Sequence, residues 1–427
     1  MKIGIIGAGF TGLSAGYNLL EKGHDVIIFE KDSIPGGLAL GFNEKEWDWT
    51  LEKHYHHWFT NDKFILGLAK EIGHEVIIER PKTSVLVEDE IFQFDSPLTV
   101  IKFPKLTIFE RLRMGFAVAS IRYNPIWKPL EKINATTFLP KIMGERGYKM
   151  IWEPLFKNKF GQHIHNVSLA WIWARLVKRT SSLAYPSGGF SNFADHLVEE
   201  IKNKGGKFYF NTQVLEIDSN GKPTITFQTD DSKPKAADFD KVIVTLPSFL
   251  FLRMVKNLPL DYIRKFAKLK GLGATNLMLR LSKPFLTDGT YWLNVCDENN
   301  PIMAIVDHSN FMDKKYYNNE HLLYLGNYLE PDSKRFAMNK DEVLKLFDPF
   351  LRKINPDYKK HLIGYELFKV PFAQPVIPTN YSKMIPPFET PLPNVYLANI
   401  EQVYPWDRGT NYAVELGEKI TEYILAK

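Results

Sequence analysis

Short apolar runs and one amphipathic stretch alternate at the start of the chain. Residues 2–6 form an apolar run that is too short for a helix and is typical of a buried strand. An amphipathic stretch follows at residues 13–22, and a second apolar run occupies residues 26–29. The pattern predicts a strand, a helix and a strand in the order of a parallel βαβ unit.

A glycine-rich turn joins the first strand to the helix, and Glu30 follows the second strand. A GxGxxG turn with an acid about 20 residues further on is typical of dinucleotide-binding folds. Gly7 permits the tight turn, Gly9 lets the backbone approach a pyrophosphate, and Gly12 lets the helix pack closely on the strand. The helix N-terminus attracts phosphate, whereas the Glu30 carboxylate suits ribose hydroxyls and would repel a 2′-phosphate. NADP is therefore not expected here.

A Gly-Gly pair, Gly36-Gly37, follows Glu30 by a few residues. The glycine turn, the acid and this pair together resemble the superfamily of amine oxidases, protoporphyrinogen oxidases, phytoene desaturases and UDP-galactopyranose mutases. The resemblance implies FAD as the cofactor, with Gly36 and Gly37 beside its pyrophosphate and ribityl chain. It also implies an α/β fold, namely a Rossmann-like FAD-binding domain of the GR2 type with an inserted α+β substrate domain.

The resemblance covers nearly the whole chain and implies two domains. The FAD-binding domain is discontinuous and comprises residues 1–84, 185–247 and 385–427, and the substrate-binding domain comprises residues 85–184 and 248–384. Residues 96–179 are mostly helical in pattern and rich in Phe, Trp and Arg. One antiparallel sheet is predicted from four apolar runs at residues 277–281, 291–295, 302–306 and 322–328.

A final helix is predicted to open near residue 410, and the resemblance places its first amides under the flavin pyrimidine ring. It also assigns a backbone contact with adenine to Val214, and Glu401 stands where the superfamily has an acid after a strand. The residues expected to bind the cofactor are Gly7, Ala8, Gly9, Phe10, Thr11, Gly12, Glu30, Lys31, Gly36, Gly37, Leu38, Val214, Glu401, Arg408, Gly409, Thr410 and Asn411.

Three residues are candidates for catalysis. His54 and His57 match a His-x-x-His arrangement that lies beside the flavin in the mutase branch, where a histidine can hydrogen-bond or carry charge. A structural histidine cluster and a metal site are the alternatives, and no metal is expected. Arg175 and Arg179 are four residues apart on one predicted helix and could clamp a phosphate or carboxylate, or lie on a solvated face. Arg175 is the third candidate.

Composition narrows the class of protein. The chain has 427 residues, a net charge of +5 and no dense basic tract, so nucleic acid is not an expected partner. One cysteine, Cys296, excludes an internal disulfide framework and favours the cytoplasm. No apolar stretch reaches the ~18 residues of a membrane span, although residues 114–121 and 245–255 could pack on a core or rest on a membrane as a peripheral contact.

Three functions remain open from the sequence. The first is an FAD-dependent oxidoreductase that dehydrogenates a C–N or C–C bond of a small molecule, either anionic or partly apolar. The second is a sugar-nucleotide mutase that uses reduced flavin without net redox change. The third is a non-catalytic escort protein for prenyl groups, which shares the fold and lacks the flavin.

Overall fold

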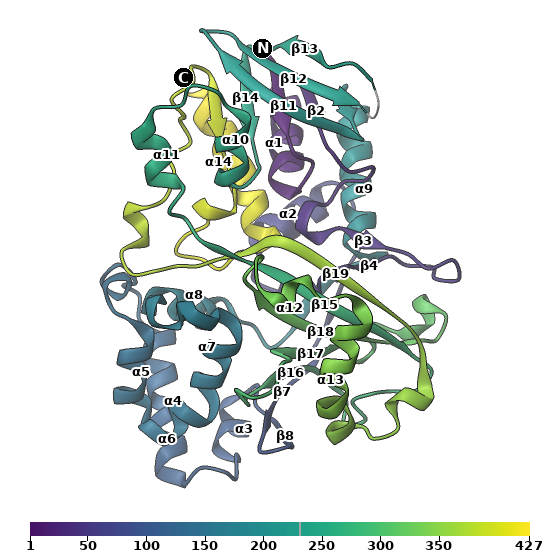
Figure 1. Ribbon diagram of the computed structural model, residues 1–427, viewed down its shortest axis with the longest axis vertical. Helices are drawn as coiled ribbons and strands as arrows, with labels where there is room; N and C mark the ends of the chain where they lie inside the picture. Colours follow the sequence, from purple (N-terminus) through teal and green to yellow (C-terminus); the bar gives the residue numbers. More distant parts are fainter. Residues whose placement is uncertain (230–231) are drawn as a thin grey trace.

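A parallel sheet forms the core of the part of the molecule that holds both chain termini (Figure 1). The computed structural model describes residues 1–229 and 232–427. Within these residues the sheet has five strands in the order β10-β2-β1-β14-β20, and every neighbouring pair is parallel. The strands are β1 (Lys2–Ile6), β2 (Asp25–Phe29), β10 (Lys207–Tyr209), β14 (Lys241–Val244) and β20 (Val395–Leu397). β14 and β20 are buried along their whole length, as parallel strands covered on both faces are.

The first and last helices pack against each other beside this sheet. Helix α1 (Phe10–Glu21) begins three residues before its predicted start, and α14 (Thr410–Leu425) is the predicted final helix. The Ser14 hydroxyl donates to the Val414 carbonyl at 3.0 Å, and the Thr421 hydroxyl donates to the Ala15 carbonyl at 3.4 Å. The two ends of the chain therefore lie side by side.

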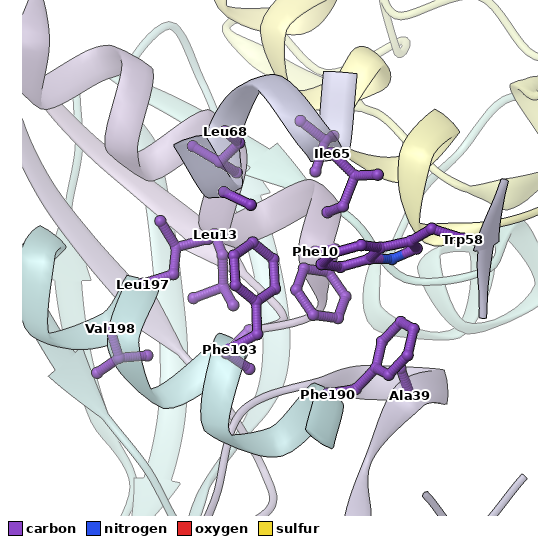
Figure 2. Packing of buried hydrophobic residues seen from close by; sticks show 14 of the residues in the cluster. Phe10, Leu13, Ala39, Trp58, Ile65, Leu68, Phe190, Phe193, Leu197 and Val198 are labelled. Atoms are coloured by element: carbon purple, nitrogen blue, oxygen red, sulfur yellow. The ribbon is translucent and has the colours of Figure 1, made fainter. Parts of the chain in front are cut away.

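Trp58 connects an aromatic cluster to the start of α14. Its ring is fully buried and meets Phe190 and Phe193 edge-on, with centroids 5.3 and 5.2 Å away (Figure 2). The indole N–H of Trp58 donates to the Thr410 hydroxyl at 2.8 Å. Helices α2 (Lys63–Glu71) and α9 (Gly189–Asn203) complete this cluster, and α9 begins four residues before its predicted start. The cluster thus fixes the position at which α14 begins.

A seven-stranded sheet forms the second layer, in the order β19-β15-β18-β17-β16-β7-β8. The four predicted strands are its middle, and they pair with one another in the predicted antiparallel direction. At the edge of this group β7 pairs with β16 in parallel. A period-2 pattern shows which face of a strand is buried and not the direction of its partner. The strands are β7 (Lys82–Val87), β8 (Glu90–Gln93), β15 (Gly271–Leu281), β16 (Thr290–Val295), β17 (Ala304–Asp307), β18 (His321–Leu329) and β19 (Leu362–Pro375).

Residues 97–178 form a helical part with an apolar core of its own, as the pattern predicts. Its helices are α3 (Pro97–Ile101), α4 (Ile108–Arg122), α5 (Ala135–Met143), α6 (Glu145–Gly147), α7 (Glu153–Phe160) and α8 (Leu169–Lys178). The remaining helices are α10 (Ser248–Met254), α11 (Leu260–Phe266), α12 (Lys334–Ala337) and α13 (Lys340–Ile354). The smaller strands are β3 (Gly41–Phe42), β4 (Leu51–Glu52), β5 (Trp58–Phe59), β6 (Val76–Glu79), β9 (Leu183–Pro186), β11 (Thr212–Ser219), β12 (Pro223–Thr229) and β13 (Lys235–Asp238).

None of the helices in the described residues has the length and hydropathy needed to cross a membrane. The residue bounds of the two domains and the cytoplasmic location both stay predictions.

A buried carboxyl group, Glu52, connects the elements that meet between the two sheets. Its carboxylate accepts from the Tyr185 hydroxyl at 3.0 and 2.9 Å and from the Phe190 amide at 2.9 Å. The Tyr324 hydroxyl, on β18, donates to the Glu52 carbonyl at 2.5 Å. Burial raises the pKa of Glu52 to about 7, which the Phe190 and Tyr185 donors only partly offset. Glu52 is therefore harder to ionise in the folded chain than in the unfolded one.

Glu52→Gln is expected to flatten the pH dependence of stability. Because the folded pKa lies above the unfolded value of 4.5, Glu52 makes the folded state progressively less stable as the pH rises from about 4.5 to about 7. The difference in free energy of unfolding between pH 5.5 and pH 7 is expected to shrink by on the order of 1–2 kcal/mol in the variant. Chemical denaturation at both pH values measures this, and an unchanged difference would contradict it.

Candidate flavin and substrate site

The glycine turn has the geometry that its sequence predicts. Gly7 adopts a positive φ of 106°, which L side chains rarely adopt, and its amide donates to the Phe29 carbonyl at 2.8 Å. A Cβ at Gly12 would lie only 2.0 Å from the Gly7 carbonyl oxygen. The turn therefore brings the start of α1 against the end of β1 with no room for a side chain at Gly12.

The Gly-Gly segment lies directly against this turn. The Gly36 amide donates to the Ala8 carbonyl at 3.0 Å, and a Cβ at Gly37 would lie 3.0 Å from the Gly9 Cα. A Cβ at Gly9 would lie 3.7 Å from the Gly37 Cα. The two segments thus leave a narrow cradle of bare backbone next to a helix N-terminus, which is what a pyrophosphate requires.

Glu30 is buried at the end of β2 and has partners of its own. One carboxylate oxygen accepts from the Ala8 amide at 2.8 Å and the other from the Asp32 amide at 3.0 Å. A carboxylate has about four acceptor positions, so capacity for a ribose hydroxyl remains. Lys31 is exposed, with its ammonium 3.9 Å from the Asp32 carboxylate.

Val214 lies where β11 starts beside the end of β2. The Thr212 amide donates to the Glu30 carbonyl at 2.8 Å, which places this strand next to the acid. The register of β11 on β12 shifts between Val214 and Glu216, so the ladder is interrupted at this point. An interrupted ladder leaves backbone groups for other partners, which suits the predicted backbone contact.

The Asn411 side chain, at the start of α14, forms hydrogen bonds to another helix of the protein. The Asn411 side-chain oxygen accepts from the Phe64 and Ile65 amides at 3.0 and 3.2 Å and so caps α2. Helix α2 follows Asp62, whose side chain forms no cap, and the first amides of the helix donate instead to a residue far along the chain. The backbone amides of Thr410 and Asn411, in the first turn of α14, remain available for a cofactor.

Asn411→Ala is expected to destabilise the protein without a direct effect on the chemistry of the site. It leaves two backbone amides of α2 without their acceptor, which costs about 1–3 kcal/mol of the free energy of unfolding. Denaturation of the apoprotein measures this loss. Asn411→Asp, which keeps the acceptor, is the control, and equal losses in both variants would contradict the capping role.

Glu401 does not reach the cavity described below. Its carboxylate accepts from the Ser248 hydroxyl and, at 3.0 Å, from the Ser248 amide, and the side chain is buried. Burial raises the pKa of Glu401 in spite of these donors. A side-chain contact between Glu401 and the cofactor therefore has no support in this arrangement.

A cavity of about 330 Å³ lies between the Gly-Gly segment, the helical part and the start of α14. Leu38, which follows Gly37, lines one side, and residues 407–412 line another. Four consecutive residues, His54, Tyr55, His56 and His57, face the same space. Its aromatic and aliphatic walls include Phe59, Trp152, Leu155, Phe156, Trp171, Ile172, Trp292 and Met303. The Gly-Gly segment of the cradle thus continues directly into Leu38, a residue of the cavity wall.

Basic side chains outnumber acidic ones in this cavity. The acidic residues are Asp62 and Asp407, and the basic ones are Lys159, Arg175, Lys178, Arg179 and Arg408. Arg175 forms an ion pair with Asp407, and this charge holds the pKa of Asp407 below its usual range although burial opposes ionisation. Arg408 donates to the Gln374 side-chain oxygen at 3.0 Å and to the Tyr328 hydroxyl.

Arg179 has a different position from the one predicted. Helix α8 ends at Lys178, and Arg179 is extended, so the two arginines do not share a helix. Both nevertheless line the cavity. Arg179 is exposed, and among the residues described no carboxylate lies within ion-pair distance of its guanidinium. Arg179 is therefore available to an anion inside the cavity, whereas Arg175 is already paired.

The histidines are neutral hydrogen-bonding groups. Burial lowers the pKa of both His54 and His57 to about 3, so neither carries charge at neutral pH. His54 Nδ1 lies 3.0 Å from the Asn276 side-chain nitrogen, and His57 Nδ1 lies 3.1 Å from the Tyr291 hydroxyl. Of the two predicted roles, hydrogen bonding is retained and the charged role is not. Residues 1–229 and 232–427 contain no cluster of three His, Cys, Asp or Glu side chains that could hold a metal ion.

Several lining residues were not identified from the sequence. Burial and the nearby Arg175 charge lower the pKa of Lys159 well below its usual value, and its ammonium nitrogen lies 5.2 and 4.8 Å from the ring centroids of Trp171 and Tyr328. Asn276 and Asn327 are polar positions inside otherwise apolar strands, which is the one signal that could have found them.

Unpartnered polar atoms gather around the cavity. Within the described part of the chain, five buried atoms of its lining have no hydrogen-bond partner: Trp152 Nε1, Trp171 Nε1, Asn276 Oδ1, Asn327 Nδ2 and Tyr412 Oη. Such atoms are rare in folded proteins and mark groups that bind something else. Together with the glycine cradle, they fit a bound flavin nucleotide and a substrate.

The chain belongs to the family of flavin containing amine oxidoreductases, whose model matches residues 10–402. It is an FAD-dependent oxidoreductase, and its fold is the predicted Rossmann-like FAD-binding fold with a substrate domain. The family assignment removes the escort-protein alternative.

Curated relatives are similar over much of the chain. A 15-cis-phytoene desaturase of Glycine max is 22% identical over 93% of this chain and 75% of its own length. A coproporphyrinogen III oxidase of Staphylococcus aureus is 24% identical over 62% of this chain and 64% of its own length, just under two thirds of that enzyme.

Solved structures share the fold over the whole chain. An oxidoreductase from Methanosarcina mazei has a TM-score of 0.77 and 19% identity, and covers 100% of both chains. A putative protoporphyrinogen oxidase from Exiguobacterium sp. 255-15 has a TM-score of 0.76, 16% identity and coverage of 100% and 99%. A reduced UDP-galactopyranose mutase has a TM-score of 0.77, 18% identity and coverage of 100% and 95%.

Proposed function

We propose that the protein dehydrogenates a C–N or C–C bond of a small molecule that carries carboxylate or phosphate groups on a partly apolar body. The observation that supports this is the convergence of four cationic side chains, those of Arg175, Lys178, Arg179 and Arg408, and two acidic ones on a cavity with aromatic walls. Cationic side chains in a water-poor cavity attract anions strongly and repel a protonated amine. These side chains do not increase the binding affinity for an uncharged polyene.

The name of one curated relative contains a substrate of this class. A porphyrinogen combines an apolar ring system with carboxylate side chains, and coproporphyrinogen III is in the name of the Staphylococcus aureus relative. We therefore take carboxylated porphyrinogens as the first compounds to test.

Each part of the cavity has a role in this proposal. FAD, when bound, supplies a hydride acceptor. Arg179 binds the anionic group of the substrate, and Arg175 is held in place by Asp407. The walls formed by Trp152, Phe156 and Trp171 hold the apolar body and exclude water.

Lys159 is the proton acceptor in the proposal. Burial and the nearby Arg175 charge lower the pKa of Lys159 and so favour its neutral amine form, in which Nζ accepts the proton that the substrate loses on dehydrogenation. Neutral His54 and His57 orient polar groups of the substrate by hydrogen bonds.

The test is anaerobic reduction of the purified holoenzyme by a panel of compounds. Coproporphyrinogen III and protoporphyrinogen represent the anionic class, benzylamine the cationic class, and phytoene in detergent the uncharged class. Loss of the visible flavin absorbance is expected with the anionic compounds. Faster reduction by benzylamine than by any anionic compound would contradict the proposal.

A mutase-like reaction is the second candidate, because the same basic residues suit a diphosphate. In that case UDP-galactopyranose is converted only after reduction of the enzyme with dithionite, and without oxygen uptake. Conversion by the oxidised enzyme would eliminate this candidate.

A further inference from the structure

Helix α4 carries a row of apolar side chains on its outer face. The described residues include 15 large hydrophobic side chains that are exposed, and 8 of these lie between residues 98 and 126. We call these eight the apolar stripe: Leu98, Ile101, Ile108, Phe109, Leu112, Phe116, Tyr123 and Ile126. Phe109 and Phe116 are the most exposed large apolar side chains of α4, at 81% and 77%. Scattered exposed apolar residues are normal, but such a concentration marks an interaction surface.

The stripe belongs to a helix that is firmly held from behind. Met114, Ala117 and Ile121 are the buried residues of α4 and pack on apolar core residues. The Thr107 hydroxyl accepts from the Glu110 amide while the Glu110 carboxylate accepts from the Thr107 amide, so the helix has a complete capping box. The outward apolar residues are therefore a property of the folded state.

Basic residues surround the stripe. Residues 96–132 contain seven Lys or Arg and two Asp or Glu, and since the chain has 54 and 49, the other residues contain 47 of each. The entire net charge of +5 thus resides in this segment. Both of its acids are engaged, because Glu131 is buried and Glu110 caps α4 and pairs with Arg146. Lys102, Lys128 and Lys132 are exposed, and none has a carboxylate within 4.0 Å among the residues described.

We propose that the apolar stripe docks on the surface of a lipid bilayer that contains anionic lipids. An interfacial helix inserts its apolar side chains at the level of the acyl chain boundary, while flanking Lys and Arg side chains bind anionic headgroups. The described helices are too short or too polar to cross the bilayer, so the contact is peripheral. A second copy of the chain is a poorer occupant, because a symmetric pair would place two equally basic segments against each other.

The docking surface overlaps only the first of the two segments that the sequence suggested, because Phe116 lies within residues 114–121. Met114 and Ile121, at the two ends of the first segment, are buried, and so is Phe251 in the second. The contact is instead formed by residues that interleave with the buried ones on α4, together with α3. In Figure 1 these helices lie at the end of the molecule opposite both termini.

The test is flotation of the holoenzyme with vesicles. Wild type is expected to float with vesicles of equal parts phosphatidylglycerol and phosphatidylcholine, and far less with phosphatidylcholine alone. The variant Phe109→Ser/Phe116→Ser is expected to bind the anionic vesicles about 10- to 100-fold more weakly, since two exposed rings no longer leave water. The control Leu260→Ser/Ile363→Ser changes two exposed apolar residues outside the stripe and is expected to bind as wild type does.

A charge variant tests the lipid requirement separately. Lys102→Gln/Lys128→Gln/Lys132→Gln is expected to lose most of the preference for phosphatidylglycerol. Flavin absorbance and the melting temperature, measured on every variant, verify that the fold is intact. No flotation of wild type, or equal flotation of wild type and the Phe109→Ser/Phe116→Ser variant, would overturn the proposal. Light scattering that finds a dimer dispersed by that double substitution, without vesicle binding, would assign the stripe to a second copy instead.

Discussion

A Gly9→Ala variant is expected to fold and to be purified without FAD. The added methyl group has room in the chain itself, because its nearest described neighbour, the Gly37 Cα, is 3.7 Å away. It would nevertheless occupy the cradle between the glycine turn and the Gly-Gly segment, where the pyrophosphate has to approach the backbone. We expect the dissociation constant for FAD to rise at least about 100-fold, and activity to be lost with the cofactor. The flavin-to-protein ratio and a fluorescence titration of the apoprotein measure this.

Two other glycines provide controls for this experiment. Gly67 lies inside α2, and no described atom outside its own helix backbone lies within 4 Å of a Cβ placed there. Gly67→Ala is therefore expected to bind FAD normally and to be more stable by about 0.5–1 kcal/mol. Gly12→Ala, with its 2.0 Å clash on the Gly7 carbonyl, is expected to disrupt the turn itself. Normal FAD affinity of Gly9→Ala would show that the cofactor binds elsewhere.

An Arg179→Gln variant is expected to keep FAD and to lose affinity for the substrate. Arg179 faces the cavity and has no carboxylate partner in the described chain, so its guanidinium is free for the substrate anion. Loss of one charge-assisted pair corresponds to about 1.5–3 kcal/mol. The KM for the porphyrinogen that reduces the flavin is expected to rise about 10- to 100-fold, with a smaller change in kcat.

Two control variants distinguish the loss of substrate binding by Arg179 from the general effect of removing one positive charge. Arg264→Gln removes an exposed arginine whose ion-pair partner among the described residues is the surface residue Asp261, and is expected to leave KM unchanged. Arg179→Lys is expected to restore part of the affinity, because a single charge remains without the fork geometry. A wild-type KM in Arg179→Gln would refute the assignment of this residue, while the flavin content would still report on the cofactor site independently.

The dinucleotide half of the site could be predicted because its determinants are local. The turn at Gly7–Gly12 is set by neighbouring residues, and the strands on either side have the predicted bounds to within one residue. The Gly36–Gly37 pair could also be found, since glycine is required where a Cβ would collide with a neighbouring backbone, as a Cβ at Gly37 would at 3.0 Å from the Gly9 Cα. The position of Gly36 and Gly37 beside the glycine turn was predicted from the family resemblance. The pattern of hydrophobic and polar residues alone does not indicate it.

The substrate half depends on contacts between distant parts of the chain. Asn411 caps a helix that lies 346 residues earlier in the chain. No sequence pattern near Asn411 indicates this partner. The orientation of Arg179 depends on where α8 ends, which is the least certain feature of a helical pattern. Asn276 and Asn327 line the cavity only because β15 and β18 pair and turn those positions inward. The predicted histidine charge failed for a related reason, since the desolvation that removes it is a tertiary effect.

The strand order of the parallel sheet determines which parts of the fold can form while the chain is being synthesised. β14 lies between β1, at the very start, and β20, near the end, and α1 packs on the last helix. While the ribosome is still making the final segment, β14 has an open edge and α1 lacks its companion. The glycine turn and the Gly-Gly segment, which form the cofactor cradle, thus precede β20 and α14 in the order of synthesis. The part of the cavity that residues 407–412 line can form only after those residues have been made.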